Sequence, residues 1–220
     1  DGSVVTKSSP IQIGTASNWS SVFAGLAFGG AIRDDGILFA WGLNTSNQLG
    51  DGTAISKSSP VQIGTTSWLQ VKGGQTHSLG IDSVSNLYGW GAFGGLYSST
   101  PAYPWLVISE GASHTSAIRS DGMLFTWGNN ATGQLGDGTS VNKSSPVQIG
   151  TSSWSAVSSG GGHTLAITST GQLFAWGLNS SFEVGDGSTI NQSSPIQIGT
   201  SSWLQVNAGT NHSLGLTINN

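Results

Sequence analysis

The sequence contains no cysteine, which excludes disulfide bonds and cysteine-ligated metal sites. Charged residues make up only 7% of the chain, against about 25% in an ordinary soluble domain. Only six residues are lysine or arginine, they are scattered along the sequence, and the formal net charge is −4. Because binding to a phosphate backbone needs clustered cations, we expect no nucleic-acid partner.

Long hydrophobic runs are also missing. No apolar stretch approaches the roughly 20 residues of a membrane-spanning helix, so we expect no membrane insertion. No segment has the 3.6-residue periodicity of an amphipathic helix. A charge-poor surface rich in serine, threonine, asparagine and glycine is typical of extracellular, cell-surface or virion proteins, and that is the location we expect.

Glycine and tryptophan are abundant instead, with 34 and 9 residues. Many glycines with little charge can indicate disorder, but disordered chains rarely carry so many large apolar side chains. Glycines at regular intervals between short apolar runs are typical of tight turns between short strands. The composition therefore predicts an ordered, all-β protein.

Tryptophan and histidine recur in a fixed order. A first tryptophan is followed by a histidine after nine residues, by a Trp-Gly pair after thirteen more, and by the next first tryptophan after 27, so the repeat is 49 residues long. The first tryptophans are Trp19, Trp68, Trp105, Trp154 and Trp203; the histidines are His77, His114, His163 and His212, with Phe28 in the first repeat; the Trp-Gly tryptophans are Trp41, Trp90, Trp127 and Trp176.

One connection is shorter than the others, because only 15 residues separate Trp90 from Trp105. Deletions are tolerated in loops better than in strands, so the constant part of the repeat predicts strands and the 27-residue part a connection. We expect a single repeat domain over residues 1–220, with repeat units at about 19–67, 68–104, 105–153 and 154–202 and partial units at both ends.

Local motifs predict the strands and turns of each repeat. In residues 114–127, two short apolar segments flank Asp121 and Gly122, and Asp-Gly indicates a hairpin because the turn needs a positive φ. The second repeat has Val84 and Ser85 there, so we expect a turn of another type or a strained one. In the connections, Gly-Asp-Gly predicts a compact turn, and Pro-Val-Gln-Ile predicts a strand with proline at its start.

These motifs together resemble the repeat of the regulator of chromosome condensation family. The resemblance is carried by residues 111–115, 120–122, 125–130 and 133–136, and it extends over essentially the whole chain as about four and a half repeats. It implies a β-propeller, usually of seven blades. We expect a fragment of a larger polypeptide, or pieces completed by other copies; the alternative is a small closed propeller of four or five blades.

The motifs of enzymes and metal sites are missing from the sequence. Histidines at equivalent positions of successive blades would form a ring too wide for one metal ion, so we expect them to bind the backbone of a neighbouring blade. One aspartate per turn is too few for calcium. No nucleophile elbow occurs at a strand–helix junction, and no dinucleotide-binding glycine motif opens a helix. We expect no catalytic residue, no metal site and no cofactor.

The shortened connection contains the candidate binding residues. It lacks the Gly-Asp-Gly turn and has gained Phe93, Tyr97 and Tyr103 beside Trp105. Aromatic side chains in an irregular loop are typical of recognition hot spots. The alternative is that they only repack a shortened loop.

These observations predict a non-enzymatic structural or interaction module. We expect it to display loops for a protein or glycan partner on a cell surface or virus particle, as part of a larger assembly. The family resemblance implies an alternative, a regulatory propeller that inhibits an enzyme or exchanges nucleotide on a small GTPase. The scarcity of charge weighs against exchange.

Overall fold

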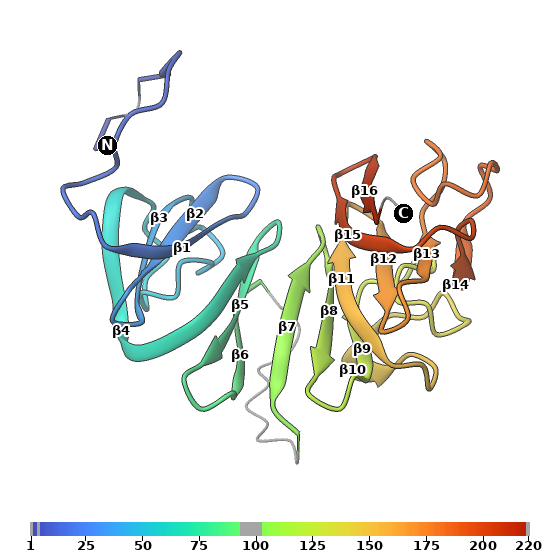
Figure 1. Ribbon diagram of the computed structural model, residues 1–220. Helices are drawn as coiled ribbons and strands as arrows, with labels where there is room; N and C mark the ends of the chain where they lie inside the picture. Colours follow the sequence, from blue (N-terminus) through green and yellow to red (C-terminus); the bar gives the residue numbers. More distant parts are fainter. Residues whose placement is uncertain (1, 4, 93–102, 219–220) are drawn as a thin grey trace. The chain divides into compact units, whose positions relative to one another are not determined.

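The computed structural model describes residues 2–3, 5–92 and 103–218, in two compact units formed by residues 1–100 and 101–220 (Figure 1). Within the described residues, every regular element is a β-strand. This confirms the all-β prediction. The described part of the chain also contains no helix long and apolar enough to span a membrane.

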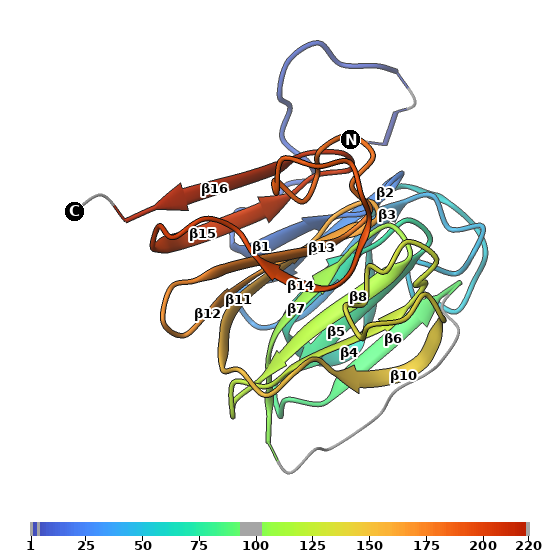
Figure 2. The same ribbon diagram turned by 90° about the vertical axis from the view of Figure 1, so that its right-hand side faces the viewer.

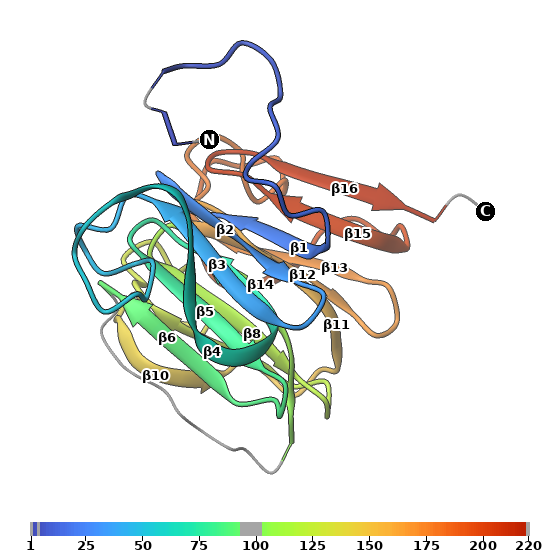
Figure 3. The same ribbon diagram turned by 90° about the vertical axis from the view of Figure 1, so that its left-hand side faces the viewer.

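The first unit contains six strands that are hydrogen-bonded in chain order. They are β1 (Trp19–Ala24), β2 (Phe28–Arg33), β3 (Ile37–Gly42), β4 (Lys57–Gly73), β5 (His77–Asp82) and β6 (Leu87–Gly91). β4 is 17 residues long; its part up to Ser67 pairs with β3, and its part from Trp68 pairs with β5. Figure 3 shows this strand curving from one set of strands to the other.

The second unit contains two four-stranded sheets and a hairpin. One sheet consists of β7 (Trp105–Glu110), β8 (His114–Arg119), β9 (Leu124–Gly128) and β10 (Lys143–Gln148); the other consists of β11 (Trp154–Ser159), β12 (His163–Thr168), β13 (Leu173–Gly177) and β14 (Gln192–Gln197). The hairpin of β15 (Trp203–Ala208) and β16 (Ser213–Thr217) lies beside β11 and β12 (Figure 2). We call the strands of each repeat a blade and number the blades one to five in chain order.

The turn between the second and third strands of a blade has the same form in blades two and three. Gly122 has a φ of 80° and donates its amide to the carbonyl of Arg119. Ser85 has a φ of 67° and donates in the same way to Asp82. Of the two alternatives for the second repeat, the strained turn is therefore the one that occurs. The Asp82 carboxylate supports it by accepting the amide of Asn86 at 2.8 Å.

The proline of the connection is not at the start of its strand, as the sequence suggested. β10 begins at Lys143, and Pro146 lies in its middle; β14 has Pro195 at the same place. Both strands are at the edge of their sheets, where a missing amide breaks no ladder. The pairing of β10 with β9 is irregular between Lys143 and Val147, so the proline falls in the interrupted stretch.

Aromatic rings pack against one another in each of the first four blades. In blade four, the Trp154 ring lies 5.5 Å from that of Phe174, edge to face, and 6.2 Å from that of Trp176. Trp176 is fully buried, as is Trp127 in blade three. In the second unit, the tryptophans of the Trp-Gly pairs are thus packing residues rather than a binding surface.

Neighbouring blades of the second unit share their hydrophobic cores. Ile118, Leu124 and Ile149 of blade three pack with Trp154 and Val157 of blade four. Side chains of blade four pack in the same way with Val206 of the fifth blade. Each blade therefore covers a face of the next one, as the repeat requires.

Candidate functional site

The repeated histidines join successive blades of the second unit through hydroxyl groups. Nε2 of His114 lies 2.9 Å from Oγ1 of Thr164. That hydroxyl donates its only proton to the carbonyl of Gln134 at 2.9 Å, so the hydrogen between His114 and Thr164 must come from the imidazole. The expected partner was the backbone of the neighbouring blade; the partner found is a side chain.

His163 repeats this junction with the fifth blade. Its Nε2 lies 3.0 Å from Oγ of Ser213, which donates to the carbonyl of Glu183. Burial lowers the pKa of His163, an effect that nearby Glu183 opposes and His212 reinforces. Within residues 2–3, 5–92 and 103–218, no three histidine, aspartate or glutamate side chains are placed to hold a metal ion. His114 and His163 are structural links between blades.

Each of three long connections folds around its own buried asparagine. We call these connections, residues 44–56, 130–142 and 179–191, the asparagine loops. In the second of them, Nδ2 of Asn130 donates to Oδ1 of Asp137 at 3.0 Å and to the carbonyl of Val141 at 3.2 Å. Its Oδ1 accepts the amide of Leu135 at 2.9 Å. Asn44 and Asn179 make the same bonds, and all three asparagines are fully buried.

The pKa of the aspartate in each asparagine loop is lowered, which favours its ionised form. Burial disfavours the charged form of Asp51, but hydrogen bonds from Thr53, Lys57 and Asn44 outweigh this effect and lower its pKa to about 2. The pKa of Asp137 is likewise held below its usual value, against the effect of burial, by bonds that include one from Lys143.

Each asparagine loop presents an exposed aliphatic side chain. Ile55 is 65% exposed, Val141 61% and Ile190 69%. Val5, at the same position of the partial repeat before Trp19, is 66% exposed. The carbonyls of the first three are bound by the buried asparagines, which fix the backbone there. A recurring apolar side chain that a rigid loop holds in water adds nothing to the core, and such side chains are typical of contact surfaces.

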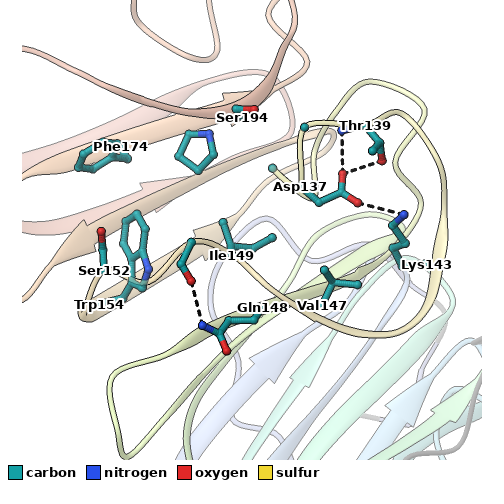
Figure 4. Close-up of a pocket in the computed structure, with 14 residues that line it drawn as sticks. Asp137, Thr139, Lys143, Val147, Gln148, Ile149, Ser152, Trp154, Phe174 and Ser194 are labelled. Atoms are coloured by element: carbon teal, nitrogen blue, oxygen red, sulfur yellow. Dashed lines mark hydrogen bonds and ion pairs between the residues drawn. The ribbon is translucent and has the colours of Figure 1, made fainter.

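A groove of about 730 Å³ lies beside the second asparagine loop, between blades three and four (Figure 4). At one end, the Asp137 carboxylate accepts the Thr139 hydroxyl at 2.7 Å and pairs with the Lys143 ammonium at 3.1 Å. At the other end lie Trp154 and Phe174. The groove thus has a polar and an aromatic end, as a site for a chain with mixed side chains would need.

The four aromatic residues predicted to bind a partner are only partly described. Phe93 and Tyr97 lie outside the described residues. Tyr103 is 50% exposed and lies 5.4 Å from the guanidinium carbon of Arg119, whereas Trp105 is only 4% exposed and belongs to the core of blade three. A binding role for these residues stays a prediction, and the buried Trp105 ring offers a partner little surface.

The asparagines and the exposed aliphatic residues were not singled out from the sequence, although a signal existed. An asparagine follows each of three Trp-Gly tryptophans by three residues, and an isoleucine or valine follows Gly-Asp-Gly by three. A polar residue at a fixed place beside a turn suggests a hydrogen-bond network that holds the turn. An apolar residue in a polar loop suggests a side chain exposed for contact with a partner.

Comparison with known families identifies the repeat. A model of the regulator of chromosome condensation (RCC1) repeat matches residues 35–81, 121–167 and 170–216, and a second model of this repeat matches residues 154–183. No curated protein sequence matches the chain significantly.

Solved structures share the fold. The structure of Prp20p from Saccharomyces cerevisiae, described with its binding properties to Gsp1p and histones, matches 96% of this chain at 19% identity with a TM-score of 0.85; human WBSCR16 matches 91% at 21% identity with a TM-score of 0.83. The ectodomain of the Physcomitrella patens receptor kinase CR4 matches 91% at 16% identity with a TM-score of 0.63. The chain spans 59%, 58% and 50% of those three chains, respectively. The likeness confirms the propeller fold.

Proposed function

Because the chain belongs to the regulator of chromosome condensation (RCC1) repeat family, we propose that it is a non-enzymatic module that binds another protein through its asparagine loops. The observation that carries this proposal is the recurrence of an exposed aliphatic side chain in each loop with a fixed backbone, at Ile55, Val141 and Ile190. Rigid loops lose little conformational entropy when they bind, so such side chains favour association.

The chemistry of the loops favours a protein over a glycan. Aliphatic side chains gain most by burial against apolar surfaces, which proteins offer. In the groove, the Trp154 ring is almost fully buried and offers a glycan no open face for stacking. Protein binding by this fold is also supported by the work on Prp20p, but 19% identity carries none of its partners over to this chain.

The proposal includes a setting on a cell surface or virus particle. Its support is the low charge of the chain and the occurrence of the same fold in a receptor kinase ectodomain. Enzyme inhibition and nucleotide exchange on a GTPase are the regulatory alternatives. They are supported by the family alone, since none of the described contacts favours either.

The test is a selection of binding peptides on the full 220-residue chain. A phage library of random dodecapeptides is selected on the wild type and counter-selected on a chain with Ile55→Asn, Val141→Asn and Ile190→Asn. We expect clones that bind the wild type at least about tenfold more tightly, a difference of about 1.4 kcal/mol.

The chain offers a matched control for this triple variant. Leu69, Leu106 and Leu204 are equally exposed, at 61%, 59% and 63%, but they lie at the β-bulges after the first tryptophans and not in the loops. Replacing these three with asparagine should leave the binding of the clones unchanged. A selection that finds no clone with a preference for the wild type over the loop variant would refute the proposed function.

A further inference from the structure

The asparagine loop of the fourth repeat carries an aromatic residue at a position with a left-handed backbone. Asn47, Gly133 and Phe182 occupy equivalent positions of the three loops, with φ values of 60°, 82° and 65°. Glycine and asparagine adopt this conformation readily, whereas a bulky side chain does so at a cost. Of these three residues, Phe182 is the least suited to a left-handed backbone.

Burial of the ring does not offset this cost. Phe182 is 61% exposed, so its ring stays mostly in water. The fold thus gains neither a favourable backbone nor a core contact from phenylalanine at this position. Strained residues that stability does not explain are concentrated at functional sites.

An edge strand in the position of β14 would not fit beside this ring. At Gly133, an added Cβ would lie 2.6 Å from Cα of Ser193 and 2.9 Å from the carbonyl oxygen of Gln192, because the next blade's edge strand β14 passes against this glycine. An edge strand that passed beside Phe182 as β14 passes beside Gly133 would collide with the Phe182 side chain.

The charge around the asparagine loop of the fourth repeat also differs from the charge around the other two asparagine loops. Lys57 and Lys143 pair with the loop aspartates Asp51 and Asp137, each at 3.1 Å. In the fourth repeat Gln192 replaces the lysine, and its amide binds Asp186 at 3.2 Å without neutralising the carboxylate. Residues 178–192 contain two acidic residues and no lysine or arginine.

The exposed residues of the fourth-repeat asparagine loop are held by one buried residue, Asn179, through its backbone carbonyl and its side chain. The amide of Phe182 donates to the carbonyl of Asn179 at 3.2 Å, and Nδ2 of Asn179 donates to the carbonyl of Ile190 at 3.2 Å. Ile190 is 69% exposed, and Asp186 lies on the turn between the two residues. An aromatic ring, an aliphatic side chain and an unneutralised carboxylate thus project from one fixed loop.

We infer that Phe182, Asp186 and Ile190 form a contact surface for a protein segment in which an arginine or lysine adjoins an apolar side chain. The cation would lie over the Phe182 ring and pair with Asp186, and the apolar side chain would cover Ile190. This inference rests on the proposed function and names the loop and the partner chemistry through which it acts.

The test uses the dodecapeptide clones selected on the full chain. We expect their sequences to be enriched in arginine or lysine next to an apolar residue. Binding should weaken about tenfold with Phe182→Asn and about threefold with Asp186→Asn, and it should weaken as salt is added. The matched control is Val141→Asn, which removes an equally exposed side chain from the third-repeat loop and should change the binding of these clones less than twofold.

Folding does not confound this test, because Asn47 is the native residue at the equivalent position of the loop at residues 44–56. Phe182→Asn should therefore unfold at no lower temperature than the wild type. Clones that bind Phe182→Asn as tightly as the wild type, yet not the triple loop variant, would overturn this surface and leave the proposed function standing. Clones without any preference between the wild type and the triple variant would overturn both.

Discussion

The asparagine loops of the third and fourth repeats have the same backbone bonds but different side chains. Asn130 and Asn179 bind their loops at equivalent atoms, with distances that agree within 0.1 Å. The third repeat has Gly133 and Lys143 where the fourth repeat has Phe182 and Gln192. The comparison shows that the buried asparagine fixes the backbone of the loop. The identity of the exposed residues depends instead on whether a strand of the neighbouring blade passes beside them.

The largest effect should come from exchanging the residues that differ most. Gly133→Phe would force a side chain against Ser193 and place a bulky residue at positive φ, so we expect a loss of about 4 kcal/mol in the free energy of unfolding. Urea denaturation measures it. Phe182→Gly, the reverse exchange, should change stability by less than about 1 kcal/mol. Equal costs for the two variants would show that β14 does not restrict the third loop.

The next effect concerns what the two loops share. Asn130→Ala removes a fully buried side chain that makes several hydrogen bonds, and its partners would be left unpaired, so we expect a loss of about 3 kcal/mol. Asn179→Ala should cost the same within about 0.5 kcal/mol, measured by urea denaturation. A cost below about 1 kcal/mol for either would mean that water can replace the amide.

The junction between blades four and five should depend on pH. Burial lowers the pKa of His163 below 6.5, so the unfolded chain takes up the proton first, and stability should fall as the pH drops below 6.5. His163→Phe, which copies Phe28 of the first repeat, should remove this part of the pH dependence. The measurement is the free energy of unfolding of both proteins between about pH 8 and about pH 5, a range that brackets the usual pKa of histidine. Parallel curves would contradict a neutral, buried His163.

The smallest effect should come from the charge difference between the loops. Lys143→Gln copies the fourth loop into the third and removes a partly exposed ion pair, so we expect a loss of about 0.5 kcal/mol that shrinks in high salt. Gln192→Lys should give a gain of similar size. Thermal unfolding at low and high salt measures both, and a loss that persists undiminished in high salt would point to packing of the lysine stem instead.

The sequence predicted the repeating parts of the fold well, because spacing and turn chemistry depend on local physics. The Asp-Gly hairpins and the packed tryptophans follow from positive φ and from ring burial, and both occur as expected. Ser85 was correctly marked as an unusual turn residue. The family resemblance then supplied the propeller, which the solved structures confirm.

The missed features depend on neighbours that are distant in the sequence. Pro146 lies inside its strand because β10 is an edge strand, and edges are a property of the sheet. The hydroxyl partner of His114, Thr164, is 50 residues away. Phe182 stands out only when the left-handed backbone and the passage of β14 beside Gly133 are known. The candidate site was therefore less predictable than the fold.

The continuous strand β4 has a consequence for how the first unit opens. Since its two halves complete the sheets of blades one and two, neither blade can lose this strand without unzipping part of the other. Amide protons of both blades should then exchange with solvent through one cooperative opening, whereas in the second unit, where residues 149–153 separate β10 from β11, blades three and four can exchange at separate rates.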